Sequence, residues 1–199
     1  KFLERYEQNN VYDSTPGRAF ARWSCSPSYL GQWSFTECIR VGRNLVRVPM
    51  LFDRLKEVGL SSAAINWPCT AKSTSIADNF PDVPNTLRFT SERLKQELEQ
   101  KDLSRRWTAG DVVIRDAIWT DAACQVIRAR KPNLLVLHVL NLDSTHHRHG
   151  PRSTEGYAAM ELADALVNRV LKAIDEAGIR DRTTVFIVSD HGFAAVPKV

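Results

Sequence analysis

Acidic and imidazole side chains gather in two short clusters of this chain. The first cluster is residues 143–151, with the sequence DSTHHRHGP, and the second is residues 189–193, with the sequence SDHGF. The two clusters hold four of the five histidines, and only His138 lies outside them. Carboxylates together with imidazoles are the ligands that proteins use for Zn²⁺ and ions of similar softness. Both clusters are therefore candidates for metal binding.

The spacing within each cluster sets a condition on metal binding. Asp143 and His147 are four residues apart, so they can bind one ion if this segment forms a helical or tight turn. Asp190 and His191 are adjacent, and they can share an ion only if the backbone bends, which Gly192 permits. A solvated surface turn is a competing interpretation of each cluster taken alone. Two Asp–His pairs together suggest a two-metal site, whose usual chemistry is the hydrolysis or transfer of phosphoryl groups.

Each cluster follows an apolar run that predicts a buried strand. Residues 133–142 are almost continuously apolar, which is typical of a strand covered on both faces in a parallel sheet, and residues 183–188 (TTVFIV) predict the next strand. Between them we expect a loop rich in His and Gly, then a long helix from about Ser153 to Ala177, ended by Gly178. Because parallel strands one crossover apart often lie side by side, the two clusters should lie at the same edge of the sheet.

The chain upstream also alternates between helix and strand. Pro49 starts a predicted helix that ends at Gly59, and residues 61–67 predict a short buried strand. Residues 68–90 are typical of a polar, Pro-rich loop. Further helices are expected from Ser91 to about Gln100 and from about Thr108 to Arg130. This alternation predicts a doubly wound α/β domain with a mostly parallel sheet.

The composition is that of a globular protein, and it disfavours a nucleic-acid partner and a membrane-spanning segment. With 199 residues, 43% of them hydrophobic and 25% charged, the chain is long enough for one domain with a sizeable core. Its net charge of +4 is mild and its basic residues are spread out, so no nucleic-acid partner is expected. No apolar run reaches the roughly 18 residues that span a bilayer.

The cysteines and the N-terminus say little about the compartment. The four cysteines form no Cys-x-x-Cys pair, so free or buried thiols are expected, and a Cys25–Cys38 disulfide stays open. The N-terminal residues contain neither an initiator Met nor the apolar segment of a signal peptide, so we expect a fragment of a longer protein. The sequence indicates neither a localisation nor an oligomeric state.

The two clusters and their flanking runs resemble the type I phosphodiesterase/nucleotide pyrophosphatase family of the alkaline phosphatase superfamily. LLVLHVLNLDSTHHRHGP, a long helix and TTVFIVSDHGF follow that family's Asp-x-x-Gly-His-x-x-Gly-Pro and Ser-Asp-His-Gly-Met/Phe motifs, with His146 in place of the first Gly. VPMLFDRLKEVGLSSAAINWPCT is similar to the family's segment that ends in Trp-Pro-Gly-Ser, with Cys69 in place of Gly. Asn9-Asn-Val-Tyr-Asp13 resembles the segment in which an Asn contacts the substrate phosphate.

The resemblance implies a fold and a domain organisation. The fold would be alkaline-phosphatase-like, doubly wound, with a mostly parallel sheet and helices on both faces. Residues 1–199 would form a single partial catalytic domain. In it, residues 1–48 would be an irregular segment on the substrate side, and residues 49–199 would be the βα core.

The resemblance also implies which residues bind metal and substrate. Asp143 and His147 would bind one divalent ion, and Asp190 and His191 would bind the other, both ions being zinc. Asn9 would contact the phosphate of the substrate. The family's Thr or Ser nucleophile and its remaining ligands have no match here, so the catalytic nucleophile is unknown. With two protein ligands for each ion, we expect these residues alone to bind metal weakly or not at all and to be inactive.

The implied function is metal-dependent hydrolysis of phosphodiester or pyrophosphate bonds in a small, nucleotide-like phosphate ester. Three alternatives stay open: a phosphonoacetate-hydrolase-like enzyme, a sulfatase-like enzyme and a catalytically dead binding module. The sulfatase alternative rests on Cys25-Ser-Pro-Ser-Tyr29, which is similar to Cys-x-Pro-x-Arg but has Tyr29 in place of Arg. The residue at the nucleophile position separates an enzyme, with Thr or Ser there, from a binding module, with Ala or Val.

Overall fold

The computed structural model describes residues 48–81 and 86–194 of the chain. They belong to two compact units. The first holds residues 48–81, 86–101 and 132–137, and the second holds residues 102–131 and 138–194. The predicted substrate contact Asn9, the sulfatase-like segment and the irregular segment up to residue 47 lie outside the described residues.

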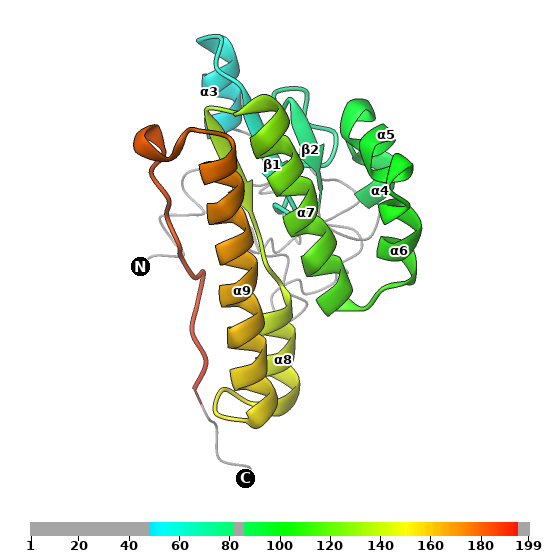
Figure 1. Cartoon of the computed structure of the whole chain (residues 1–199), viewed down its shortest axis with the longest axis vertical. Coiled ribbons are helices and arrows are strands. Elements are labelled where there is room, and N and C mark those ends of the chain that lie inside the picture. Colours follow the sequence, from blue (N-terminus) through cyan, green and yellow to red (C-terminus); the bar gives the residue numbers. More distant parts are fainter. Residues whose placement is uncertain (1–47, 82–85, 195–199) are drawn as a thin grey trace, which may run out of the picture. The chain divides into compact units, whose positions relative to one another are not determined.

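The first unit contains a three-stranded parallel sheet in the order β2-β1-β3. The central strand β1, Ser62–Ile65, pairs with β2, Asp78–Phe80, and with β3, Leu134–Leu137 (Figure 1). The chain therefore adds one strand on each side of β1, which is the pattern of a doubly wound sheet. All four residues of β1 are buried, as the sequence predicts for SSAAINW. The predicted α/β class with a mostly parallel sheet is confirmed for the described strands.

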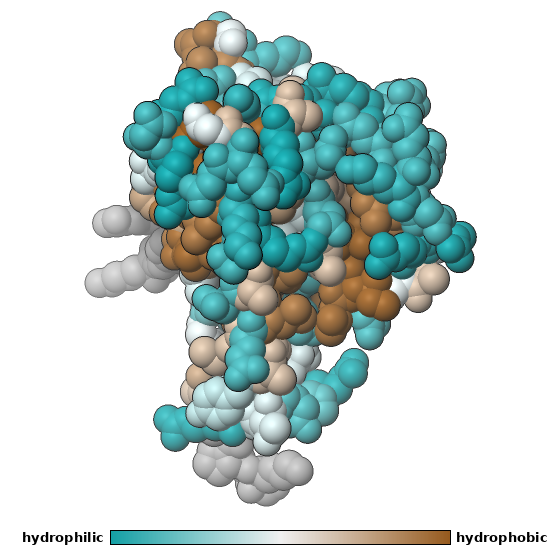
Figure 2. Space-filling model, in the orientation of Figure 1, coloured by the Kyte–Doolittle hydropathy of each residue, from teal (hydrophilic) through white to brown (hydrophobic). Residues whose placement is uncertain are grey.

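Three helices of the first unit lie in the part of the chain that the structure describes. They are α3 (Leu51–Glu57), α4 (Thr86–Phe89) and α5 (Glu92–Gln100). Helix α3 begins just after Pro49, is followed by Gly59 in the left-handed region, and places Phe52 in a core with Ala64 and Ile76. Exposed apolar side chains on and beside α3 give the hydrophobic patch at the top of Figure 2, namely Leu51, Val58 and Leu60.

The predicted loop over residues 68–90 is wrong in part, because it contains β2 and α4. Strand β2 consists of Asp78, Asn79 and Phe80, all buried, although two of them are polar. The Asn79 side chain donates a hydrogen bond to the Thr70 carbonyl at 2.7 Å, and Asp78 pairs with Arg93 at 2.9 Å. These partners allow polar residues in a strand that no hydrophobic pattern marks. Helix α5 begins where predicted, but the hydroxyl of Ser91 accepts from the Asn79 amide and does not cap the helix.

The second unit is built from helices. They are α6 (Leu103–Ala109), α7 (Val112–Arg130), α8 (Asn141–His149), α9 (Thr154–Glu176) and the short 3-10 helix η3 (Arg180–Arg182). Helices α7 and α9 lie side by side, and α8 packs against both (Figure 1). Ion pairs join α7 to α9 between Arg128 and Glu176, at 2.6 Å, and between Asp121 and Arg169.

The two long helices of this unit lie close to their predicted positions. Helix α9 begins after Ser153, whose hydroxyl accepts from the Gly156 amide at 2.9 Å, and it is followed by Gly178 in the left-handed region. Helix α7 begins later than predicted, because Asp111 caps it and the separate helix α6 precedes it. None of the helices in the described residues is long and apolar enough to cross a membrane.

Two sequence predictions around the clusters are wrong. The His-rich segment after β3 is the helix α8 and not a loop. Residues 183–188 pair with no described strand, and Figure 1 draws them as a trace without an arrow. Phe186 is 81% exposed, whereas the pattern TTVFIV predicts burial. A strand forms only where a neighbouring backbone completes its hydrogen bonds, which a hydrophobic pattern alone cannot establish.

Strand β3 is shorter and less covered than its sequence predicts. It ends at Leu137, and its residues are half-buried. The cysteines of the described residues, Cys69 and Cys124, are free thiols, in agreement with the prediction for these two.

Candidate functional site

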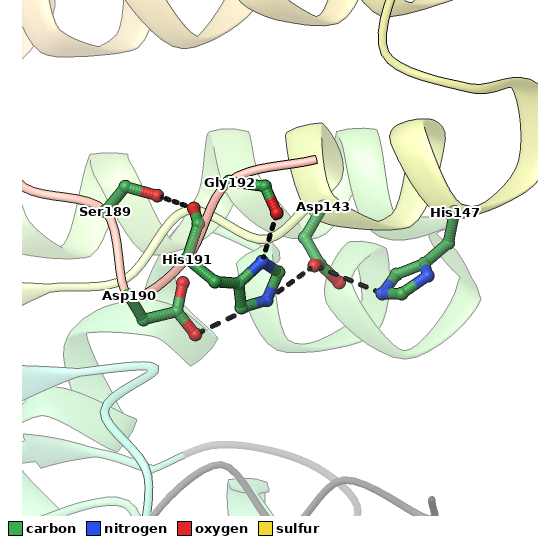
Figure 3. Close-up of polar contacts among 6 residues, drawn as sticks. All are labelled: Asp143, His147, Ser189, Asp190, His191 and Gly192. Carbon is green, nitrogen blue, oxygen red and sulfur yellow. Dashed lines mark hydrogen bonds and ion pairs between the residues drawn. The ribbon is translucent and has the colours of Figure 1, made fainter. Parts of the chain in front are cut away.

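Helix α8 places Asp143 and His147 on the same face, one turn apart. The Oδ1 oxygen of Asp143 lies 3.4 Å from Nε2 of His147 (Figure 3). The spacing required a helical or tight turn for these two side chains to meet, and the structure supplies a helix. The face of α8 that carries this pair thus presents a carboxylate beside an imidazole nitrogen.

His191 of the second cluster also lies beside the carboxylate of Asp143, on the side opposite His147. Nε2 of His191 lies 3.4 Å from Oδ1 of Asp143 and 3.6 Å from Oδ2 of Asp190. Figure 3 shows Asp143 between the two histidines, with Asp190 on the side of His191. The structure therefore brings the four predicted metal ligands together, although residues 183–188 form no strand. Their role as ligands remains a prediction.

The backbone around His191 orients its ring. Nδ1 of His191 lies 3.2 Å from the carbonyl oxygen of Gly192, and the hydroxyl of Ser189 donates to the carbonyl of His191. When His191 is neutral with its proton on Nδ1, that proton is donated to Gly192. The lone pair of Nε2 then faces the two carboxylates.

Oδ1 of Asp143 is buried and accepts no hydrogen bond from the described residues. Its two imidazole neighbours, at 3.4 Å, are farther away than the roughly 2.7–2.9 Å of a charge-assisted hydrogen bond. With metal–ligand distances of about 2.0–2.2 Å, neighbouring ligand atoms in a tetrahedral zinc site are about 3.3 Å apart. The spacing of Asp143 and His147 is thus closer to that of two ligands of one ion than to a hydrogen bond.

The four side chains meet in pairs and not around one point. Among residues 48–81 and 86–194, no three His, Cys, Asp or Glu side chains are placed to hold an ion together. Asp143 with His147 forms one pair, Asp190 with His191 forms the other, and the contact between Asp143 and His191 joins them. The described residues thus place one carboxylate and one imidazole in each pair.

Phe193 is the common neighbour of three histidines, and sequence reasoning gave it no role. Its ring centroid lies 5.0 Å from that of His146, 4.9 Å from that of His147 and 5.2 Å from that of His191. All three contacts are edge-on, with interplanar angles of 79°, 82° and 65° respectively. Edge-on packing against an aromatic ring restricts the rotation of each imidazole. Its place in the motif, directly after Ser-Asp-His-Gly, was the available signal.

The two remaining histidines of the first cluster contact helix α9. A Cβ atom at Gly156 would lie 3.1 Å from Nε2 of His146, so the ring of His146 occupies the space that this glycine leaves. Nδ1 of His149 lies 3.9 Å from a carboxylate oxygen of Glu155. The structure thus places His149 beside Glu155, in the first turn of α9.

Asp116 of helix α7 binds the start of helix α8, which carries Asp143 and His147, and it was not singled out from the sequence. It is fully buried, and its carboxylate accepts hydrogen bonds from the backbone amides of Leu140 and Asn141, where α8 begins. Burial raises the pKa of Asp116 to about 6, against the opposing effect of these two amides. No local pattern marks such a residue, because its partners lie in another helix.

The chain matches a known family over almost its whole length. Residues 8–199 match the family described as type I phosphodiesterase / nucleotide pyrophosphatase. No solved structure matches the chain.

Curated relatives match a shorter stretch. The chain is 25% identical to venom phosphodiesterase 2 of Crotalus adamanteus over 69 residues, which is 35% of this chain and 8% of that protein. It is 31% identical to mouse ectonucleotide pyrophosphatase/phosphodiesterase family member 1 over 62 residues, 31% of this chain and 7% of that protein. It is 35% identical to human family member 7 over 66 residues, 33% of this chain and 14% of that protein.

The matched stretch is thus a small fraction of each relative, whereas the family match covers both clusters and everything between them. The chain belongs to the type I phosphodiesterase/nucleotide pyrophosphatase family.

Proposed function

We propose that the described residues form part of the active site of a metal-dependent hydrolase that cleaves phosphodiester or pyrophosphate bonds. The observation that carries the proposal is the buried Oδ1 oxygen of Asp143, which lies 3.4 Å from Nε2 of both His147 and His191 and accepts no hydrogen bond from the described residues. Membership of the family and the phosphodiesterase names of the relatives support the reaction class.

The donor set itself supports a bound cation. A buried carboxylate oxygen without a hydrogen bond is costly, and a cation removes that cost. A neutral His191 with its proton on Nδ1 points a lone pair at two carboxylates, which repel it unless a positive charge lies between them. A proton on Nε2 is the other way to supply that charge, but it favours distances near 2.8 Å. The observed 3.4 Å between Asp143 and His191 and 3.6 Å between Asp190 and His191 are longer than that.

Asp143 with His147 would hold one divalent ion, and Asp190 with His191 would hold the other. Carboxylate and imidazole donors fit zinc, which as a Lewis acid stabilises the charge that develops on phosphoryl oxygens. The chain's own contribution is to fix these donors. Helix α8 sets the spacing of the first pair, and Phe193 limits the rotation of both ligand histidines.

The substrate in this proposal is a small phosphate ester, nucleotide-like, whose phosphate is contacted by Asn9. No nucleophile is assigned among the described residues, so hydrolysis by these 199 residues alone is not expected. Substrate choice would depend on parts of the protein that lie outside the described residues.

The experiment is hydrolysis of p-nitrophenyl thymidine monophosphate by a longer protein that contains these 199 residues together with the family's nucleophile and remaining metal ligands, before and after EDTA and after zinc is added back. Loss of hydrolysis with EDTA and its return with zinc are expected. The Asp190→Asn variant should lose activity and keep the far-UV circular dichroism of the wild type. Hydrolysis that survives EDTA would contradict the two-metal site. Cleavage of phosphonoacetate without cleavage of the diester would replace the proposed reaction by carbon–phosphorus bond hydrolysis.

A further inference from the structure

The first turn of helix α8 is capped by a side chain from another helix. The backbone amide of Leu140 lies 3.0 Å from Oδ1 and 3.1 Å from Oδ2 of Asp116, and the amide of Asn141 lies 2.7 Å from Oδ2. Leu140 occupies the N-cap position and Asn141 is the first helical residue. Amides at a helix start have no acceptor within the helix, so they need one from elsewhere. Asp116 supplies it from helix α7.

The sequence of α8 cannot supply this cap by itself. Its N-cap residue is a leucine, which has no hydrogen-bond acceptor in its side chain. The helix has nine residues, and Asn141 is its one buried residue. A helix this short and polar is not stable in isolation and takes its position from its neighbours. Its start is therefore determined by the carboxylate of Asp116, while the body of the helix packs against α9.

Packing alone does not explain an aspartate at this position. Asp116 is fully buried, and burying a carboxylate is unfavourable. An apolar residue would suit a purely structural core position better. The carboxylate is retained where two backbone amides converge, and these two amides precede Asp143 by three residues or fewer.

We propose that Asp116 is a positioning residue for the Asp143–His147 pair. By holding the amides of Leu140 and Asn141, it fixes the start of α8 and thereby the direction in which Asp143 and His147 project. This inference rests on the proposed function, because it assigns Asp116 to the support of a metal-binding pair. Residues that orient metal ligands in this way contribute about 10- to 100-fold to metal affinity.

Zinc affinity tests this role in a longer protein that contains these residues and the family's remaining metal ligands. It is measured by competition with a chromophoric chelator for the wild type, Asp116→Asn and Asp116→Ala. We expect Asp116→Ala to weaken zinc binding by about 10- to 100-fold. Asp116→Asn, which keeps one acceptor oxygen, should fall between it and the wild type. The visible absorption of the Co²⁺-loaded protein should change in both variants, because it reports the arrangement of the ligands.

The matched control is Asp111→Ala, which removes the side-chain cap of α7 itself, the Oδ1 oxygen that accepts from the Ile114 amide at 3.1 Å. It should lower the melting temperature and leave zinc affinity and the cobalt spectrum unchanged. If Asp116→Ala does not fold, Asp116→Asn decides the question. A folded Asp116→Asn with wild-type zinc affinity and an unchanged cobalt spectrum overturns the positioning role. A wild-type longer protein that binds no zinc overturns the proposed function instead.

Discussion

Oδ1 of Asp143 lies 3.4 Å from Nε2 of His191, although the whole of helix α9 separates the two residues in the chain. The contact joins the two acidic and imidazole clusters into one group of side chains. It forms without the strand that the sequence predicts before the second cluster. The geometry of the site therefore depends on helix α8 and on the turn around His191, and the following predictions test those parts.

Replacement of Phe193 should loosen the ligand histidines more than it destabilises the protein. Phe193 is half-buried, so Phe193→Ala should lower the free energy of unfolding by less than the roughly 3–5 kcal/mol of a core phenylalanine. Each lost edge-on contact with an imidazole removes about 0.5–1.5 kcal/mol. Zinc affinity should fall in Phe193→Ala and should fall less in Phe193→Leu. Zinc affinity and urea unfolding are measured for the wild type and both variants. Equal zinc affinity in all three proteins would show that the ring does not orient the histidines.

Gly156 and His146 should be energetically coupled. Alanine in place of glycine within a helix stabilises it by about 1 kcal/mol, but a Cβ at Gly156 would lie 3.1 Å from two atoms of the His146 ring and from the Gly150 carbonyl oxygen. Gly156→Ala should therefore give no gain in stability in the wild type. In a His146→Ala background, where the ring is absent, the same substitution should be more favourable by at least about 0.5 kcal/mol. Additive effects in this double-mutant cycle would mean that His146 does not occupy the space beside Gly156.

The stability of the protein should depend on pH through Asp116. Burial raises its pKa to about 6 from the ordinary 3.8 of an aspartate, so the folded state holds this proton more tightly than the unfolded state. The resulting stabilisation is complete below about pH 4 and is lost as the pH rises through about 6, a change of about 3 kcal/mol. Asn does not titrate, so the stability of the wild type relative to Asp116→Asn should fall over that interval. A difference that is the same at pH 4 and pH 7.5 would contradict the raised pKa.

Exposed and buried phenylalanines should respond very differently to a polar substitution. Phe186 is 81% exposed and Phe52 is 5% exposed. Phe186→Ser should change the free energy of unfolding by less than about 0.5 kcal/mol, whereas Phe52→Ser should lower it by about 3 kcal/mol or more. Urea unfolding of both variants measures the contrast. A loss at Phe186 as large as that at Phe52 would mean that residues 183–188 form the buried strand that their pattern predicts.

Helices whose ends are marked by capping or terminating residues were predictable from the sequence. Helix α9 begins after the capping residue Ser153 and ends before Gly178, and helix α3 ends before Gly59. Their boundaries depend on the residues at their own ends. Strand β1 was predictable for another reason, since a continuous run of small and apolar residues is typical of a central parallel strand.

Elements whose stability comes from distant partners were not predictable. Helix α8 is polar and has no cap of its own, because its cap is the carboxylate of Asp116 in α7. Strand β2 carries two polar residues whose partners, Thr70 and Arg93, lie outside it. Residues 183–188 show the opposite error: their hydrophobic pattern predicts a strand, but no neighbouring strand among the described residues pairs with them.

The residues of the candidate site also fall into those that the sequence identifies and those that it does not. The four Asp and His residues were identifiable, because their side-chain chemistry and short spacing indicate metal binding in any fold that brings them together. Asp116 was not identifiable, because it acts through two backbone amides at the start of another helix. The position of Phe193 in the motif was visible, but its contacts with three imidazole rings were not. Their contributions exist only in the folded chain.

The metal site around Asp143 is tested most directly by zinc binding, measured by equilibrium dialysis with metal analysis. The proteins compared are a longer protein that contains these residues and the family's remaining ligands, and its Asp143→Asn variant. Asp164→Asn, the same chemical change at an exposed position of α9, is the matched control. We expect the wild type and Asp164→Asn to bind zinc alike, and Asp143→Asn to bind it well over 10-fold more weakly. Equal zinc binding by all three proteins would contradict the assignment of Asp143 and the metal site built around it.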